Sequence, residues 1–321
     1  MTIPLAISPE APWLAPLAGF SDLPFRLLCR EHGCDIAVTE MISAKGLIYG
    51  SPGTNELLAT CVQDTPVVVQ LFGAEVDFLI KAVERLRGQG FVYFDLNCGC
   101  SVRKVTKTGS GAALLRDMPR LLAVAKAMID ATEPGCMGFK IRLGWGQNEP
   151  VYLELGQELE QLGAGWVSLH PRFATQGFTG TADWSCLRRL KERVRLPVVA
   201  SGDLFSAEDG IRCLEETGVD GLMFARGALG DPTIFERFKA LRANRPSPPK
   251  TYSAMLALVR RLFDLHADHG MERAGLLKMR TLVPRFLKGL PGARGLRRDI
   301  VFCTTIDDVL AAIEHASQNH S

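Results

Sequence analysis

Eight short apolar runs recur along the first three quarters of the chain, and most of them are followed by a stretch with helical periodicity. Several runs, such as PVVVQLF and LPVVA, are hydrophobic at nearly every position, which is typical of parallel strands covered on both faces. The expected strands are Trp13–Ala18, Cys34–Met41, Pro66–Phe72, Phe91–Asn97, Gly135–Leu143, Gly165–His170, Leu196–Ala200 and Gly221–Ala225. Strand–helix units in this number, over about 240 residues, predict a TIM (β/α)8 barrel. A doubly wound sheet is the alternative, but it does not require so many regular units.

Helical periodicity fills the gaps between these strands. We expect helices over Val76–Arg87, Leu114–Thr132 and Val151–Leu162. Asp117 and Ser206 each precede such a pattern, and both are residue types that cap helix N-termini.

The barrel pattern ends near Arg242, so we assign residues 1–242 to a catalytic barrel domain. The next segment, ANRPSPPK at residues 243–250, is polar and rich in proline, which is typical of a linker. Residues 251–321 are predicted to form a small all-α helical bundle. Its expected helices are Tyr252–His269, Arg273–Leu290 and Thr305–His315.

Charge is distributed unevenly between these two parts. From Ala243 onward the chain has 12 Lys and Arg against 7 Asp and Glu, whereas the preceding part has 25 against 28. The stretch from Arg273 to Arg298 holds eight basic residues and no acidic one. A segregated patch of this kind favours a partner with a phosphate backbone. A solvated helix face is the alternative interpretation.

Other classes of protein are disfavoured by composition. No apolar run approaches the roughly 20 residues of a membrane span, so no membrane association is expected. The first residues, MTIPLAISPEAPW, lack the charged and apolar regions of a signal peptide. Nine cysteines without regular spacing do not suggest a disulfide framework, and we expect a reducing, cytoplasmic location. We expect a monomer.

Polar and ionisable residues follow almost every expected strand. Active sites of TIM barrels lie at the carboxyl ends of the strands, so these residues predict a single site. In chain order they are Pro16, Glu40, Gln70, Asn97, Cys98, Gly99, Cys100, Lys140, Arg142, His170, Arg172, Ser201, Gly202, Asp203, Ala225, Arg226 and Gly227.

The ends of the last two strands are suited to a phosphate group. Glycines at Gly202 and Gly227 allow backbone N–H groups to come close to a ligand, and Arg226 can pair with phosphate oxygens. A simple turn role for these residues is the alternative. Lys140 lies within an apolar strand, where an unpaired ammonium is costly, so it requires an anionic or electron-rich partner. Together with Gln70, these features suggest a cofactor of the flavin mononucleotide type.

The loop DLNCGCSVRKVTKTGSGAALL carries a cysteine pair, Cys98 and Cys100. A zinc site is disfavoured, because no further cluster of Cys or His lies nearby in the sequence to complete four ligands. An accessible cysteine at a strand end, followed by Arg103 and Lys104, is better suited to act as an acid or nucleophile. The same cations are also candidates for contacts with RNA phosphates.

Segments along nearly the whole chain have the order and spacing of one known family. They are LAPLAGFSDLPFRLLCREHGCDIAVTEMISAKGL, VVVQLFG, DLNCGCSVRKVTKTGSGAALL, KIRLGW, LHPRFATQGFTGTADW, VVASGDLFS, DGLMFARGALGDPTIF and FLKGLPGARGLRRDI. On these segments the chain resembles the tRNA-dihydrouridine synthases. The resemblance implies a TIM barrel that carries FMN, is reduced by NADPH, and converts specific uridines of tRNA to dihydrouridine.

The resemblance also implies a role for individual residues. Cys100 would be the general acid that protonates C5 of uracil, Asn97 would contact the base, and Arg172 would help to position it. The implied cofactor-binding residues are Pro16, Leu17, Gln70, Lys140, His170, Ser201, Gly202, Asp203, Ala225, Arg226 and Gly227. The charge pattern, rather than the resemblance, suggests the RNA-binding residues, which we expect to be Lys104, Arg280, Arg285, Lys288, Arg297 and Arg298.

The chain departs from the family pattern at several positions near this site. The family usually has Met, Pro, Gly, Asn and Gly where this chain has Leu17, Ser101, Pro171, Ser201 and Ala225. Ser201 removes an amide from the expected cofactor site, and Ala225 adds a methyl group near the phosphate.

Two other functions are the alternatives. One is an FMN-dependent oxidoreductase that acts on a free pyrimidine, but such an enzyme would not need the basic C-terminal helices. The other is a non-catalytic tRNA-binding protein whose flavin site has decayed.

Overall fold

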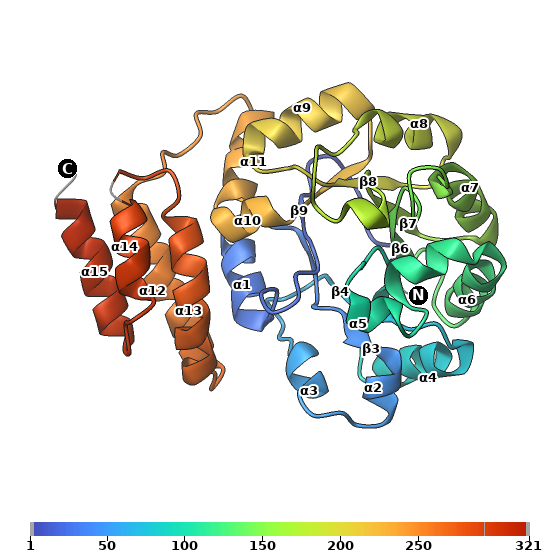
Figure 1. Ribbon diagram of the computed structural model, residues 1–321, viewed down its shortest axis with the longest axis horizontal. Helices are drawn as coiled ribbons and strands as arrows, with labels where there is room; N and C mark the ends of the chain where they lie inside the picture. Colours follow the sequence, from blue (N-terminus) through green and yellow to red (C-terminus); the bar gives the residue numbers. More distant parts are fainter. Residues whose placement is uncertain (1–2, 292, 319–321) are drawn as a thin grey trace.

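The computed structural model describes residues 3–291 and 293–318, without the side chains of Arg294 and Arg297. Parallel strands follow one another around a closed barrel, seen on the right of Figure 1. They are β1 (Trp13–Leu14), β2 (Ile36–Val38), β4 (Val67–Phe72), β5 (Tyr93–Cys98), β6 (Met137–Arg142), β7 (Trp166–His170), β8 (Val198–Ser201) and β9 (Gly221–Phe224). The β1–β9 and β2–β4 pairings close the ring, which confirms the predicted TIM barrel.

One expected strand is interrupted. Instead of a continuous Cys34–Met41, the chain forms β2 and then β3 (Ile42–Ser43), and both pair with β4. Between them, the Thr39 hydroxyl accepts a hydrogen bond from the backbone N–H of Gln70 at 3.1 Å. Because a side chain takes the place of a ladder partner here, the apolar run alone predicted too long a strand.

Side chains alternate along each strand between the barrel interior and the helix layer. At the amino ends of the strands the interior is apolar, and it includes Trp13 and Trp166, whose ring centroids are 5.7 Å apart. Gly138 makes room for this pair, since a Cβ added to it would lie 1.9 Å from the Trp166 ring. At the carboxyl ends the interior positions become polar, as at Gln70 and Asn97. The apolar half therefore closes the barrel below a polar mouth.

Helices surround the barrel and bury its outer face. They are α1 (Leu23–Glu31), α2 (Ala44–Ile48), α3 (Thr54–Leu57), α4 (Val76–Arg87), α5 (Arg103–Thr106), η1 (Gly111–Arg116), α6 (Met118–Asp130), α7 (Tyr152–Leu162), η2 (Ala174–Gln176), α8 (Ser185–Arg193), α9 (Ala207–Thr217), α10 (Arg226–Gly230) and α11 (Ile234–Arg242). The bounds of α4 match the prediction. Asp117 caps α6 and Ser206 caps α9, as predicted from their residue types. The 3₁₀ turn η1 replaces the first part of the helix expected over Leu114–Thr132.

In the described part of the C-terminal region the regular elements are all helices, which lie to the left of the barrel in Figure 1. They are α12 (Tyr252–Asp268), α13 (Glu272–Phe286), α14 (Ala293–Ile300) and α15 (Ile306–Gln318). The helix α14 was not predicted, because the Gly and Pro residues around it are typical of a loop. Helix α1 packs against α12, and α10 against α13. No helix in the described part of the chain has both the length and the hydropathy of a membrane span.

Candidate active site

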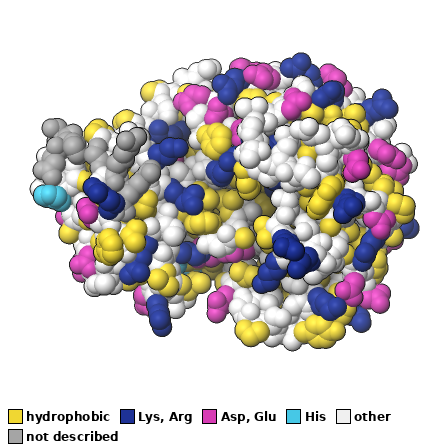
Figure 2. All heavy atoms as spheres, in the orientation of Figure 1, with side chains coloured by type: hydrophobic (Ala, Val, Ile, Leu, Met, Phe, Trp, Pro, Cys, Tyr) yellow, Lys and Arg dark blue, Asp and Glu magenta, His cyan; other side chains and the backbone are white. Residues whose placement is uncertain are grey.

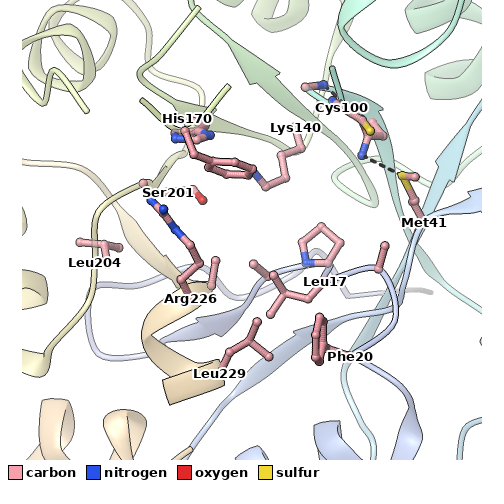
Figure 3. A pocket seen from close by; sticks show the side chains of 18 of the residues that line it. Leu17, Phe20, Met41, Cys100, Lys140, His170, Ser201, Leu204, Arg226 and Leu229 are labelled. Carbon is pink, nitrogen blue, oxygen red and sulfur yellow. Dashed lines mark hydrogen bonds between the residues drawn. The ribbon is translucent and has the colours of Figure 1, made fainter. Parts of the chain in front are cut away.

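A cavity of about 460 Å³ opens at the carboxyl ends of the barrel strands (Figure 3). It brings together most of the predicted site residues, from both halves of the barrel and from α13. Those that line it are Pro16, Leu17, Asn97, Gly99, Cys100, Lys140, Arg142, His170, Ser201, Gly202, Asp203, Ala225, Arg226 and Arg285. Figure 3 shows Cys100 and Met41 at one end of the cavity and Arg226 and Leu204 at the other.

The loop that carries Cys100 is held by hydrogen bonds on several sides. The side-chain oxygen of Asn97 accepts from the backbone N–H groups of Gly99 at 3.1 Å and Cys100 at 2.9 Å. The carbonyl of Cys100 accepts from the N–H of Ala112 at 2.9 Å. Asn97, near the end of β5, therefore fixes the conformation of the loop that follows it, and Cys100 of this loop lines the cavity.

Cys98 differs from Cys100 although only one residue separates them. It is fully buried in the helix-facing core, and burial raises the pKa of its thiol well above the usual value. Among the described residues, no group of three or more His, Cys, Asp or Glu side chains is arranged to hold a metal ion. Of the two thiols, only that of Cys100 is placed for chemistry in the cavity.

His170 is buried beside several cations. Burial, followed by the positive charges of Lys140, Arg142 and other nearby groups, lowers its pKa to about 2. Its Nε2 atom lies 3.1 Å from Nη1 of Arg172. Because a guanidinium only donates, Nε2 accepts, and the single proton of the neutral ring is on Nδ1. The ring is thus a neutral, oriented group in the wall of the cavity.

Asp203 links two arginines at the other end. Its carboxylate accepts from Arg172 at 2.6 and 2.9 Å and from Arg226 at 2.9 Å. Burial alone would raise the pKa of Asp203, but the hydrogen bond from Arg172 and the other cations lower it. The preceding Gly202 has φ +116°, and a Cβ there would lie 2.6 Å from the His170 ring. The turn therefore requires glycine, and it fixes Arg226 at the cavity.

The remaining predicted residues that the structure describes do not line this cavity. Gln70 is buried directly beneath Asn97, with its Oε1 atom 2.8 Å from Asn97 Nδ2. Arg172 is buried and also donates to the carbonyls of Thr179 and Gly180. In this structure its guanidinium is directed to Asp203 and His170 rather than into the cavity.

A second cavity of about 400 Å³ adjoins the first, between the barrel and α13. Lys250, Arg285 and Lys288 line it together with Arg226 and Gly227, so two further predicted residues lie there. Figure 2 shows a hollow on this face, with Lys and Arg side chains on both sides of it, over α5 and over the C-terminal helices.

The other predicted RNA-binding residues have separate surroundings. Lys104 is exposed on α5, and Arg298 is exposed on α14. Arg280 donates twice to the carbonyl of Cys303, at 2.9 and 3.2 Å, which ties α13 to the loop between α14 and α15. The side chain of Arg297 lies outside the described part of the structure.

Arg142, which was predicted among the residues at the strand ends, also lines the cavity. It donates to the carbonyls of Gly99, Phe173 and Gly177, and burial lowers its pKa to about 10. Two aromatic residues of the cavity, Phe178 and Phe205, were not predicted. The Arg226 guanidinium lies over both rings, 4.9 Å from the centroid of Phe178 and 4.8 Å from that of Phe205. Both are in loops, where no sequence pattern indicated them.

The character of the first cavity fits a nucleotide-like cofactor with an apolar ring and a phosphate. Leu17, Phe20 and Leu229 form an apolar side in Figure 3, opposite Lys140 and His170. Cations exceed anions in its lining, since Asp203 is the one acidic residue there against Lys140 and three arginines. Such a lining suits an anionic group at the Arg226 end.

Comparison with known families gives one match over almost the entire chain. Residues 13–321 match the model of the family described as dihydrouridine synthase (Dus). A probable tRNA-dihydrouridine synthase from Mycobacterium tuberculosis is 34% identical over 308 residues, covering 92% of this chain and 79% of that protein. The tRNA-dihydrouridine synthase B of Pseudomonas aeruginosa is 33% identical over 289 residues, covering 88% of this chain and 86% of its own.

Solved structures with a similar fold are more distant in sequence. A morphinone reductase variant in complex with tetrahydroNAD superposes with a TM-score of 0.54 at 12% identity, covering 78% of this chain and 92% of that one. A histamine dehydrogenase from a Rhizobium species gives 0.53 at 13% identity, covering 82% of this chain and 50% of that one. At this identity the likeness concerns the barrel fold.

Proposed function

The chain belongs to the dihydrouridine synthase family, and from this premise we propose that FMN and NADPH serve it in reducing the C5=C6 bond of specific tRNA uridines. Membership makes it a tRNA-dihydrouridine synthase and a flavin-dependent oxidoreductase. The observation that carries the proposal is the joint lining of one cavity by the Cys100 thiol, Lys140 and the Arg226 end.

The residues suited to hold FMN follow from the two ends of the cavity. We assign the ribityl phosphate to the turns of Gly202–Asp203 and Arg226–Gly227. There the two glycines let backbone N–H groups approach a ligand, and the Arg226 side chain supplies a positive charge. Lys140 and His170 would lie along the flavin ring. Pro16, Leu17, Ser201 and Ala225 complete the wall. When bound, the flavin supplies the hydride that reaches C6 of uracil.

Cys100 is assigned the complementary step, the donation of a proton from Sγ to C5 of uracil. Asn97 lines the cavity beside Cys100, and we assign it the contact with the base. Arg172 was predicted to position the base. Since its guanidinium is engaged by Asp203, we propose that it does so indirectly, by holding Asp203 and His170 in place.

Access of a uracil to this cavity requires that the base leave the folded tRNA. Extrusion costs a few kcal/mol, which contacts with phosphates must offset. We propose that Arg285, which lines both cavities, and Lys288, which lines the second, supply such contacts. Lys104 on α5 and Arg298 on α14 are exposed and would add contacts further out. Arg280 is reassigned to a structural role, because both of its hydrogen bonds are to the Cys303 carbonyl.

The domain division at 242/251 and the monomeric state are also proposals. No helix or strand is assigned from residue 243 to residue 251, between α11 and α12.

We also propose a cytoplasmic location. All nine cysteines are free thiols, which is compatible with a reducing compartment.

The test is reduction of tRNA by the purified protein. The cofactor released by denaturation should be FMN, and oxidation of NADPH should depend on added tRNA that lacks dihydrouridine. Mass spectrometry of the digested tRNA should then show uridine gaining two hydrogens. Reduction of free uracil or orotate, without reduction of tRNA, would contradict the proposal, and so would a protein that binds tRNA but no flavin.

A further inference from the structure

Asp95 is a buried carboxylic acid in the barrel interior to which no role has yet been given. It is 2% exposed, and it sits on β5 next to Gln70 of β4. Its Oδ2 atom has no hydrogen-bond partner of normal geometry, although the indole N–H of Trp166 is close enough to interact with the carboxyl group. Burying a carboxylate with one unpartnered oxygen is costly, so its presence calls for a function.

A chain of side-chain hydrogen bonds leads from Asp95 to the cysteine loop. Asp95 Oδ1 accepts from Gln70 Nε2 at 2.7 Å, and Gln70 Oε1 accepts from Asn97 Nδ2 at 2.8 Å. Asn97 Oδ1 in turn accepts from the N–H groups of Gly99 and Cys100. Every link is within normal hydrogen-bond distance, and the chain ends on the backbone of Cys100.

The direction of this chain depends on its first member. An amide side chain has a donor end and an acceptor end of nearly the same shape, so Gln70 and Asn97 can each be turned either way. An ionised carboxylate only accepts. Asp95 therefore turns the Gln70 nitrogen toward itself, and this leaves the Asn97 oxygen to face the two N–H groups of the loop.

We propose that Asp95 is a positioning residue for Cys100, acting through Gln70 and Asn97 to hold the cysteine loop against the cavity. The effect of Asp95 on catalysis rests on the proposed function, in which Cys100 is the proton donor. The chain of hydrogen bonds from Asp95 to the cysteine loop does not depend on that function.

The charged neighbour of Asp95 is Lys140, on the adjacent strand. Burial raises the pKa of Asp95 and lowers that of Lys140, while the opposite charge of each group favours the ionised form of the other. Replacing Asp95 therefore also changes the charge near the thiol. A test must distinguish this electrostatic effect from loosening of the loop.

Alkylation of Cys100 by iodoacetamide makes that distinction, with Cys61 as an internal reference. Cys61 is also a partly exposed free thiol, and it lies in a loop ahead of β4. The rates of both cysteines are measured by peptide mass spectrometry over a range of pH, on the flavin-loaded protein. A change in charge moves the midpoint of the pH–rate profile, whereas a loosened loop changes its high-pH plateau.

Asp95→Leu leaves Gln70 Nε2 without an acceptor. We expect the plateau rate of Cys100 relative to Cys61 to rise roughly fivefold, which corresponds to the loss of about one hydrogen bond. The kcat for tRNA reduction should fall while the KM for tRNA is unchanged. Asp95→Asn can still accept from Gln70, so its plateau should lie between those of wild type and Asp95→Leu, and it serves as the test if the leucine variant does not fold.

Ser168→Ala is the matched control, since Ser168 is another buried interior polar group without a partner, outside the chain to Cys100. Its plateau should equal that of wild type. Plateaus in both Asp95 variants equal to or below wild type would overturn the inference. Full activity of a Cys100→Ala protein would instead overturn the proposed function, and leave the alkylation result as a separate finding about the loop.

Discussion

Cys98 and Cys100 differ in what surrounds them rather than in chemistry. The alternation of β5 directs Cys98 into the core, and the hydrogen bonds of Asn97 hold Cys100 at the cavity. The sequence therefore showed that a cysteine pair follows this strand, and the family resemblance identified Cys100 as the general acid. The chain of amides beneath it could not be predicted, because it joins residues of two strands through side-chain orientations.

Replacement of Cys100 by alanine should lower the rate of dihydrouridine formation by about 10²–10⁴-fold, the usual contribution of a general acid. The residues assigned to the flavin are unchanged, so visible flavin absorbance should be retained. Single-turnover reduction of tRNA by the prereduced enzyme measures the rate. As a control, Cys98→Ala should cost about 1 kcal/mol of stability and leave the rate close to wild type. A Cys100→Ala protein with an unchanged rate would remove this residue from the mechanism.

His170 should remain neutral at every pH at which the protein is folded. Its pKa is lowered from 6.5 to about 2, so below pH 6.5 the unfolded chain binds a proton that the native state does not. Stability is therefore lost as the pH falls below 6.5. Relative to a His170→Asn variant, wild type should lose up to about 1.4 kcal/mol of unfolding free energy per pH unit between pH 6 and 4. Urea titrations at several pH values measure the unfolding free energy. If this free energy changed with pH by the same amount in both proteins, the prediction would be wrong.

At the scale of elements, regular patterns were predictable and interruptions were not. The helix α4 and the caps Asp117 and Ser206 follow from local periodicity and residue type. The break after β2 depends on a hydroxyl of Thr39 that pairs with a neighbouring strand. Likewise, α14 is stabilised by packing against α13 and α15, which its own residues do not indicate.

The contact of β6 with β7 requires glycine at position 138. In Gly138→Ala the added Cβ would lie 1.9 Å from the Trp166 ring, within a core that cannot expand freely. We expect a loss of about 3 kcal/mol in unfolding free energy, the upper end of the usual cost of overpacking. Chemical denaturation gives this value. Gly146→Ala is the control, since no atom lies within 4 Å of a Cβ added there. Equal stabilities of the two variants would show that the barrel interior adapts.

For the whole molecule, the position of the C-terminal helices on the barrel determines where the basic residues lie. Asp22, the N-cap of α1, accepts hydrogen bonds from Lys278 at 2.5 Å and from His266 at 3.2 Å. Burial alone would raise the pKa of Asp22, but hydrogen bonds and charge from His266 and Lys278 lower it. Gly275 of α13 allows this helix to pack closely on α12, because a Cβ there would lie 2.7 Å from His266.

Asp22→Asn should weaken this docking while retaining the helix cap, since asparagine is also a good N-cap. Loss of one member of a buried ionic group leaves the others uncompensated, at roughly 3 kcal/mol. Because the pKa of Asp22 is lowered, its contribution to stability is present above pH 3.8 and is lost as the pH falls through the folded-state value. Thermal unfolding at pH 7 measures the effect. An unchanged melting temperature would mean that the helices are held by apolar packing alone.

Binding of tRNA should depend steeply on salt, as it does where cations release counterions. Charge reversal at Lys288, at the edge of the second cavity, should weaken affinity and reduce the slope of log K against log salt by about 1. Fluorescence anisotropy with labelled tRNA measures both quantities. Arg195→Glu is the control, because Arg195 precedes β8 at the opposite end of the barrel. Equal effects of the two reversals would mean that the cations near α13 are not a binding surface.

The proposed reaction requires that the flavin and the Cys100 thiol face the same base. A crystal structure of the flavin-loaded protein with a uridine-containing tRNA fragment tests this most directly. We predict density for the flavin along Lys140, with its phosphate at Arg226, and a uracil between the ring and Sγ of Cys100. A uracil bound outside the barrel mouth, or a thiol turned away from C5, would contradict the account.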